Sequence, residues 1–406
     1  MHPLPLVRSH RDPSVCRRAQ AKWAGCQQRL AREEALTWSS FILLARETRT
    51  TGKETVLGRI RIGVAGLGRI GWKCHCREIA QSADFELAAV QDVVPERRQE
   101  AEHVYGVPSY ATFGAMLRRG HLDAVTIATP SHLHARMAVA ALRAGCHVLL
   151  EKPMARDAKE AEAIVRAAEE GERLVTVFQS LRALAYFQHL QRLLASGIIG
   201  QVYHVHLAGF RYVRRNDWQS LIRYGGGVLL NGGSHLIDQL LQLIGYNVTR
   251  IFCDRKVVAS LGDAEDVLKI VVVTREGVTG EIDMNQAATV SSSGPQAWGT
   301  EGALELTPGG DAFTVTLLDK SDLPPKELDP SLASRDRLYP NDDIWVKRKT
   351  IGVDPDYLVD IYADFASAIL RGTPLFVKPE EPLAVMRLID ACRRDSGRIR
   401  RISAKE

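Results

Sequence analysis

The fold is decided by residues 61–71, which read RIGVAGLGRIG. The first five form a short apolar run typical of a strand, and Gly66, Gly68 and Gly71 follow in the spacing G-x-G-x-x-G. In this spacing the first glycine makes a tight turn, the second lets the backbone approach a pyrophosphate, and the third lets a helix pack closely on the strand. The stretch therefore predicts a strand, a turn and a helix that bind a dinucleotide.

An aspartate supports this interpretation. A second strand is predicted over Phe85–Val90, and Asp92 follows it, 21 residues beyond Gly71. A carboxylate at this distance accepts hydrogen bonds from the adenosine ribose hydroxyls and repels a 2′-phosphate. Because Arg97 and Arg98 fall a turn into the next helix, we expect NAD rather than NADP. The alternative is a structural loop with a solvent-exposed aspartate.

Strand and helix patterns alternate from Arg59 to about Gln179. Strands that alternate with helices of about 10–15 residues predict a doubly wound parallel sheet with helices on both faces, as in a Rossmann domain. Beyond Gln179, extended stretches follow one another with turn signals, and Gly277 is expected to connect two of them as a hairpin. The predicted fold class is therefore α/β, with a parallel sheet followed by a second α/β domain whose sheet is mostly antiparallel.

The end of the chain gives local predictions. We expect Asp319–Tyr357, which is rich in Pro and Asp, to be a loop, and helices over Pro355–Arg371 and Glu381–Asp395. The predicted division is a poorly ordered basic extension at 1–57, a dinucleotide-binding Rossmann domain at 58–179 and a C-terminal α/β domain at 180–406.

The net charge of +5 over 406 residues is unevenly spread. Residues 1–60 hold 11 Lys/Arg and 5 Asp/Glu, a net of +6, whereas the other 346 residues hold 42 and 43, a net of −1. No aromatic interleaving or phosphate-reading motif accompanies the basic segment, so we expect no nucleic-acid partner. We interpret residues 1–57 as a poorly ordered extension. The alternatives are a secretory or twin-arginine signal and an organelle transit peptide.

The composition, 45% hydrophobic and 25% charged, is that of a globular protein. No apolar run approaches the roughly 18 residues that cross a bilayer, so we expect no membrane partner and a cytoplasmic location. Seven cysteines, an odd number in a long chain, do not indicate a disulfide framework. Cys74-His75-Cys76 looks like a metal cluster. Residues two apart on a helix point in different directions, however, so buried structural thiols are favoured.

Two further stretches carry polar residues. Glu151-Lys152-Pro153 ends a strand, at the carboxyl edge where ligands bind in open α/β sheets. The glycine-rich residues 225–238 open a helix that is expected over Asn231–Ile244. One polar stripe of that helix is formed, on helical spacing, by Asn231, His235, Asp238 and Gln242. The stripe is either the solvated face of the helix or part of a ligand site, and the neighbouring glycines favour the site.

Together these stretches resemble the Gfo/Idh/MocA oxidoreductase family, whose members include inositol dehydrogenase and glucose–fructose oxidoreductase. The resemblance covers residues 59 to about 398. Residues 64–71 look like the family's nucleotide loop, and residues 128–134, ATPSHLH, resemble its stretch beside the nicotinamide. Glu151–Pro153 matches its lysine motif, and residues 225–238 match its second signature.

The resemblance implies a Rossmann domain followed by a domain with a large open sheet. In the family that sheet often serves for oligomerisation, so we expect a homodimer or homotetramer. The resemblance also implies a cis peptide bond between Lys152 and Pro153.

One departure concerns Asn231. Many catalytic members have aspartate at this position, where it is thought to work with the histidine in proton transfer. Asparagine can orient an imidazole but cannot hold a proton as a carboxylate does. Because Lys152 and His235 are both retained, we still expect an active enzyme.

The resemblance implies a role for each site residue. Lys152 is expected to stabilise a developing alkoxide, His235 to exchange the hydroxyl proton, and Asn231 to orient His235. The expected cofactor-binding residues are Gly66, Gly68, Arg69, Ile70, Gly71, Asp92, Thr129, Pro130, His134, Glu151, Lys152 and Gln179. The expected substrate-binding residues are Arg182, Tyr212, Arg214, Trp218 and His235.

The other histidines give weaker predictions. His204 and His206 alternate on a strand and so point to one face, which is either the pocket or an interface. A zinc site built from His132, His134 and His235 is disfavoured, because the family's hydride chemistry usually needs no metal. We therefore expect no metal ligand.

The resulting hypothesis is an NAD-dependent oxidoreductase that transfers hydride between nicotinamide and a carbinol or carbonyl carbon of a sugar, cyclitol or related polyol. Two alternatives stay open. One is a reductase similar to dihydrodiol dehydrogenase, and the other is a non-catalytic, nucleotide-binding regulatory protein of the same fold.

Overall fold

The computed structural model describes residues 58–290, 293–322, 326–328, 330 and 345–402. The basic extension predicted at 1–57 lies outside these residues. Among the helices that are described, none is long and apolar enough to cross a membrane.

The first sheet has six parallel strands in the order β3-β2-β1-β4-β5-β6, which confirms the predicted doubly wound domain. Its strands are β1 (Ile60–Ala65), β2 (Phe85–Gln91), β3 (Ser109–Tyr110), β4 (Ala124–Ile127), β5 (His147–Leu150) and β6 (Val175–Val177). All four residues of β4 are buried, as expected for a parallel strand with helices on both faces.

The glycine turn joins β1 to a π-helix, η1 (Gly71–Cys76), which continues as α2 (Arg77–Gln81). Gly66 has a φ of +91°, which favours glycine. A Cβ at Gly71 would lie 1.8 Å from the carbonyl oxygen of Gly66, so the helix approaches the strand too closely for any side chain there. Backbone conformation at Gly66 and steric crowding at Gly71 therefore explain why the predicted turn needs glycine at these two positions.

Helices and helical turns connect the strands of both sheets, and a side-chain cap starts several of them, among them α4 with Thr112 and α6 with Asp157. In the first half of the chain they are α3 (Pro95–Tyr105), α4 (Phe113–Arg119), η2 (Ser131–Leu133), α5 (His134–Arg143), α6 (Ala158–Gly171), α7 (Ser180–Ala183) and α8 (Ala185–Ala195). In the second half they are η3 (Trp218–Ser220), η4 (Ile222–Tyr224), α9 (Gly233–Ile244), η5 (Lys320–Asp322), η6 (Pro355–Tyr357), α10 (Ile361–Arg371) and α11 (Glu380–Ser396).

The second sheet has nine strands in the order β14-β13-β12-β11-β7-β10-β9-β8-β15. It is mostly antiparallel, as predicted, and the pairs β7–β10 and β8–β15 are parallel. The expected hairpin is formed by β9 and β10. The strands of the second sheet are β7 (Val202–Phe210), β8 (Val248–Val257), β9 (Val267–Thr274), β10 (Thr279–Asn285), β11 (Ser293–Gly299), β12 (Gly302–Leu306), β13 (Ala312–Leu318), β14 (Val346–Gly352) and β15 (Arg400–Arg401).

The expectation of a loop over Asp319–Tyr357 is wrong for β14. This strand pairs with β13 and forms one edge of the sheet. Its sequence, VKRKTIG, lacks the apolar alternation of a half-buried strand, and its side chains are nearly all exposed. Charged edge strands of this kind discourage pairing with further chains, and they escape a search for apolar periodicity.

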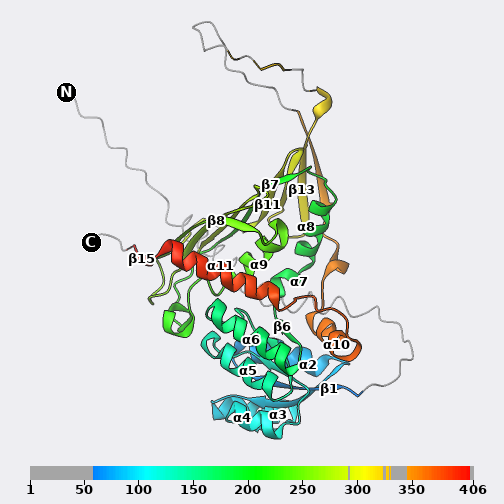
Figure 1. Cartoon of the computed structure of the whole chain (residues 1–406), viewed down its shortest axis with the longest axis vertical. Coiled ribbons are helices and arrows are strands. Elements are labelled where there is room, and N and C mark those ends of the chain that lie inside the picture. The colour runs from blue at the N-terminus through cyan, green and yellow to red at the C-terminus, as the bar shows by residue number, and fades with distance from the viewer. Residues whose placement is uncertain (1–57, 291–292, 323–325, 329, 331–344, 403–406) are drawn as a thin grey trace, which may run out of the picture. The chain divides into compact units, whose positions relative to one another are not determined.

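Helices α9 and α11 cover one face of the second sheet (Figure 1). α9 packs on β7 and β10, and α11 packs on β8 while also contacting α6 beside the first sheet. These contacts bring the amino end of α9, which carries His235, toward the carboxyl ends of the parallel strands.

α10 packs with the first sheet, although its residues lie in the segment assigned to the second domain. The predicted helix Pro355–Arg371 is divided into η6 and α10, because the Asp360 side chain accepts a hydrogen bond from the Ala363 N–H and starts a new helix. Tyr362 and Phe365 of α10 belong to the same apolar cluster as the strand residues of β1 and β2. The first domain is therefore completed by a late part of the chain.

Replacing Phe365 by alanine is predicted to destabilise the first domain, because this side chain is 0% exposed and stacks on Phe85. Loss of a buried aromatic side chain costs about 3–5 kcal/mol of unfolding free energy. Urea unfolding followed by fluorescence measures this change, with Arg371→Lys on the exposed end of α10 as the control. An unchanged unfolding free energy in the Phe365→Ala variant would show that α10 does not stabilise this domain.

Candidate active site

Asp92 holds the glycine turn. Its Oδ2 accepts a hydrogen bond from the Leu67 N–H at 2.8 Å and lies 3.4 Å from Arg97 Nη1, while its Oδ1 accepts from the Val94 N–H at 2.9 Å. Arg98 donates to the Asp92 carbonyl. The carboxylate is thus fixed beneath the turn, and Oδ1, which accepts a single hydrogen bond, keeps a further lone pair for a ligand hydroxyl.

The open side of the turn fits a dinucleotide. A Cβ built at Gly68 meets no other atom within 4 Å, so the backbone there borders free space. Arg69 and Ile70 are exposed beside it, where the helix begins. The amino end of a helix carries unpaired N–H groups and a partial positive charge, which suit a pyrophosphate.

Lys152 lies just beyond β5, and the Lys152–Pro153 peptide bond is cis, as the resemblance implied. Its ammonium nitrogen lies 3.0 Å from Asn231 Oδ1 and 3.3 Å from the Asn231 carbonyl oxygen. Burial lowers the pKa of Lys152, and the charges of Arg215 and Arg69 lower it further against the opposing effect of Glu151.

His235 lies in the first turn of α9 and is buried. Its Nδ1 lies 2.9 Å from Gln179 Oε1. An amide oxygen only accepts, so Nδ1 carries the proton and Nε2 presents a lone pair. Burial, together with the positive charge of Lys152, holds the pKa of His235 well below its ordinary value, and the imidazole is therefore neutral near neutral pH.

Asn231 contacts Lys152 rather than His235, contrary to the predicted orienting role. It precedes α9, which begins at Gly233, and so does not continue the helical stripe. Its side-chain amide also pairs with the amide of Gln219 at 3.4 Å in both directions. The partner that orients His235 is Gln179, which was predicted to contact the cofactor.

Thr129 and Pro130 lie in the loop after β4, and His134 is the first residue of α5. The ring nitrogens of His134 lie 2.8 Å from the Pro153 carbonyl oxygen and 2.9 Å from that of Thr129. His134 therefore connects the loop after β4 with the loop that carries Lys152. Glu151 is also buried there, where its Oε2 accepts a hydrogen bond from the Lys152 N–H at 3.0 Å.

Arg182 is not brought to this site. Its side chain is 2% exposed and is bound by the carboxylates of Asp238 and Glu381. The remaining polar residues of the predicted stripe are also engaged, since Gln242 donates to Glu381. The predicted polar stripe is thus neither a solvated face nor a single ligand surface. His235 faces the site, whereas Asp238 and Gln242 contact Arg182 and Glu381, respectively.

The other expected substrate residues lie between β7 and α9. Tyr212 and Arg214 are exposed, and Trp218 is partly buried at the start of η3. The neighbouring Arg215 was not singled out from the sequence. It pairs with Asp217 at 2.8 Å, and its charge reaches Lys152. Because residue spacing in a loop does not predict where a side chain points, no sequence signal distinguishes Arg215 from Arg214.

His204 and His206 point away from the site. Their Nε2 atoms lie 3.2 Å from Glu281 and 2.9 Å from Asp283 on β10, whose alternate residues face α9. His206, Glu281 and Asp283 have the spacing of a metal-ligand group. The ammonium of Lys269 binds both carboxylates and supplies the positive charge there.

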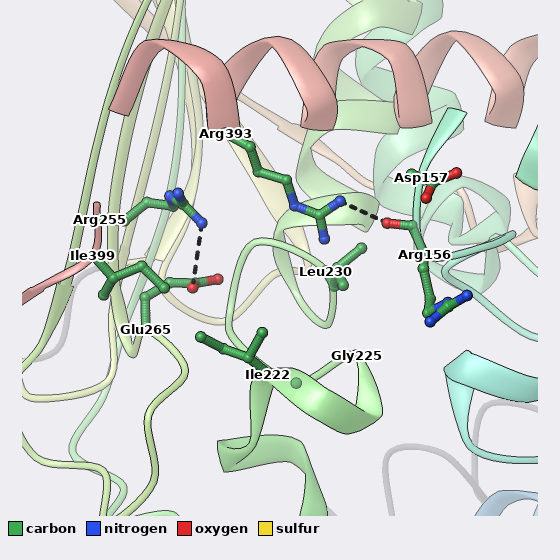
Figure 2. A pocket seen from close by; sticks show the side chains of 10 residues that line it. Arg156, Asp157, Ile222, Gly225, Leu230, Arg255, Glu265, Arg393 and Ile399 are labelled. Atoms are coloured by element: carbon green, nitrogen blue, oxygen red, sulfur yellow. Dashed lines mark hydrogen bonds and ion pairs between the residues drawn. The ribbon is translucent and has the colours of Figure 1, made fainter. Parts of the chain in front are cut away.

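A separate cavity of about 240 Å³ is lined in part by Gly225 and Gly226 of the glycine-rich segment (Figure 2). Arg393 of α11 donates to the Arg156 carbonyl at 2.6 Å, and Arg255 lies 3.8 Å from Glu265 across the cavity wall. Neither Lys152 nor His235 lines it, and these arginines are occupied by protein groups. We therefore assign this cavity no part in the chemistry.

Two family models match the chain. Residues 60–179 match an oxidoreductase family with an NAD-binding Rossmann fold, and residues 187–305 match the GFO/IDH/MocA C-terminal domain. Together they span more than half of the chain, including all of the first sheet and strands β7 to β11 of the second.

Individual proteins agree with these models. The rhizopine catabolism protein MocA of Rhizobium meliloti is 28% identical, over 64% of this chain and 83% of its own. The myo-inositol 2-dehydrogenase of Thermotoga maritima is 28% identical, over 56% of this chain and 69% of its own. The structure of the WlbA dehydrogenase from Bordetella pertussis, in complex with NADH and UDP-GlcNAcA, superposes with a TM-score of 0.67 at 25% identity, covering 84% of this chain and 97% of that one.

The matched models, the glycine turn, the half-buried lysine and the buried histidine agree with one another. The chain belongs to the Gfo/Idh/MocA family of NAD-binding oxidoreductases.

Proposed function

We propose that this protein is an NAD-dependent dehydrogenase that moves hydride between nicotinamide and a carbinol carbon of a sugar, cyclitol or related polyol. The observation that carries the proposal is a half-buried lysine held by Asn231 and a buried histidine held by Gln179, both at the carboxyl edge of a dinucleotide-binding sheet. The related inositol dehydrogenase and the sugar-nucleotide complex of WlbA support the substrate class.

The glycine turn and the exposed amino end of η1 would hold the cofactor pyrophosphate, and Asp92 would face the adenosine ribose. When bound, NAD supplies the hydride acceptor. The protein has to place the substrate hydroxyl, remove its proton and stabilise the charge that develops on its oxygen.

His235 is the proposed general base. With Nδ1–H donated to Gln179, the lone pair on Nε2 accepts the hydroxyl proton during oxidation and returns it during reduction. Asn231 cannot take this proton, so the departure from the family's aspartate leaves His235 as the base.

Lys152 is the proposed electrostatic catalyst. Its ammonium is held by Asn231 and can donate to the substrate oxygen, where it stabilises the developing alkoxide. The same positive charge lowers the pKa of His235 and keeps it ready to accept a proton.

The substrate contacts are assigned to the segment between β7 and η3. Trp218 is proposed to stack on the apolar face of a sugar ring, with Tyr212 and Arg214 at the entrance and Arg215 near the reacting oxygen. Arg182 is left out, because Asp238 and Glu381 occupy its guanidinium. The family also suggests two or four subunits, which stays a prediction.

Lys152→Ala is predicted to lower turnover by about 100-fold or more, because it removes the donor that stabilises the alkoxide. NAD affinity should stay close to wild type. Small molecules that co-purify are identified by mass spectrometry, and NAD reduction is then measured on these and on a panel of polyols. Exposed Lys159→Ala is the matched control. Near-normal turnover of Lys152→Ala would refute the role assigned to this lysine.

The pH dependence of oxidation follows from the two buried groups. Because the pKa of His235 is held well below 6.5, kcat/KM should fall on the acid side only well below pH 6.5. Because the pKa of Lys152 is lowered from 10.5, the alkaline fall should begin below that value. Steady-state rates across pH test both limbs, and an acid limb centred at or above pH 6.5 would contradict a neutral, buried base.

Two glycine variants separate cofactor binding from folding. Gly68→Ala should leave the melting temperature near wild type, since its Cβ meets no protein atom, but weaken NAD binding by about tenfold, equal to about 1.4 kcal/mol. Gly71→Ala should lower the melting temperature by several degrees, because its Cβ collides with the Gly66 carbonyl. Calorimetric titration and thermal denaturation make the comparison. Unaltered NAD affinity in Gly68→Ala would place the pyrophosphate elsewhere.

A further inference from the structure

His75 is a buried histidine that the proposed mechanism does not use. It lies in η1, directly behind the glycine turn, and is 0% exposed. Among the described residues, the flanking Cys74 and Cys76 do not converge with His75 on a common point as metal ligands would. Burial raises the pKa of both thiols to about 12. His75 instead makes two side-chain contacts of its own.

These contacts join three parts of the chain. His75 Nε2 lies 3.2 Å from Glu151 Oε1, and His75 Nδ1 lies 2.9 Å from the hydroxyl of Tyr362 in α10. That hydroxyl lies 3.2 Å from Thr126 Oγ1 in β4. Phe178 packs edge-on against the His75 ring, so the imidazole cannot turn freely.

The chemistry of the groups gives the chain of hydrogen bonds a direction. An ionised carboxylate only accepts, so His75 donates its Nε2–H to Glu151. Burial raises the pKa of Tyr362 well above its ordinary value, so the phenol keeps its proton and donates it to His75 Nδ1. Thr126 completes the chain by donating to the tyrosine oxygen.

Glu151 connects this chain to Lys152, because its second oxygen, Oε2, accepts a hydrogen bond from the Lys152 backbone N–H at 3.0 Å. Burial alone raises the pKa of Glu151, but the hydrogen bond from His75 and the positive charge of Lys152 outweigh it, and the net pKa is lowered. Glu151 is the carboxylate that favours the charged form of Lys152, whereas Arg215 and Arg69 oppose that form. If Glu151 were uncharged or displaced, the nearby charges of Arg215 and Arg69 would lower the pKa of Lys152 without opposition from this carboxylate.

We propose that His75 and Tyr362 are positioning residues of the hydride-transfer site: they hold Glu151 ionised against Lys152, and so keep Lys152 protonated toward the substrate oxygen. The role of Lys152 in this statement rests on the proposed function, whereas the hydrogen-bond chain does not. Neither residue touches substrate. The π-helical turn of η1 serves this arrangement, in keeping with the frequent occurrence of such turns at functional sites.

The test measures the protonation of Lys152 directly in the full-length protein. Trace acetylation by acetic anhydride is followed by peptide mass spectrometry as a function of pH, with exposed Lys159 as internal reference. His75→Phe keeps a ring but removes the donor, and its Lys152 midpoint should fall by about one pH unit or more. His75→Gln restores a donor to Glu151 and should bring the midpoint back to near the wild-type value.

An unchanged Lys152 midpoint in a folded His75→Phe variant would overturn the proposal, as would an equal shift in His75→Gln. Should His75→Phe fail to fold, Tyr362→Phe removes a single oxygen and provides the second test. Its midpoint should shift in the same direction by a smaller amount, and an unchanged midpoint would also overturn the proposal.

This measurement needs no substrate, so it can fail independently of the proposed function. A wild-type protein that oxidises no polyol, yet shows the expected Lys152 shifts, would leave the hydrogen-bond chain standing and refute the dehydrogenase assignment. With an active substrate, His75→Phe should lower kcat by about 10–100-fold with KM for NAD little changed, and His75→Gln should recover most of it.

Discussion

The half-buried ammonium of Lys152 is the charge on which the rest of the site depends. A charge withdrawn from water is costly unless other groups stabilise it. Here Asn231 accepts a hydrogen bond from the ammonium, and the negative charge of Glu151, which accepts from the Lys152 backbone N–H, favours the charged form. The same ammonium holds the pKa of His235 well below its ordinary value, after the larger effect of burial. The positive charge of Lys152 thus has two proposed effects: it stabilises the developing alkoxide, and it helps to keep the base His235 neutral.

The fold supplies these groups from distant parts of the chain. Lys152 follows β5 of the first sheet, whereas Asn231 and His235 arrive at the start of α9, which packs on the second sheet. α10 then returns from the carboxyl-terminal part of the chain to pack beside β1 and β2, where Tyr362 reaches His75. The site therefore exists only when both sheets and the returning helix are in place.

The glycine turn, the parallel sheet and the lysine motif could be predicted because their signals are local in sequence. The pairing of His235 with Gln179 spans 56 residues, and that of His75 with Tyr362 spans 287, so no periodicity reveals them. Arg182 was among the expected substrate-binding residues, but its carboxylate partners Asp238 and Glu381 lie 56 and 199 residues further along the chain, where no local pattern reveals them. β14 was missed because its edge position favours charge over apolar alternation.

Deuterium transfer tests the central claim most directly. Polyols, cyclitols and sugars that carry deuterium on their carbinol carbons are incubated with the protein and NAD, and the reduced cofactor is analysed by mass spectrometry. At least one of them is expected to deliver deuterium to C4 of the nicotinamide. Bound NAD that acquires no deuterium from any member of the panel would contradict it.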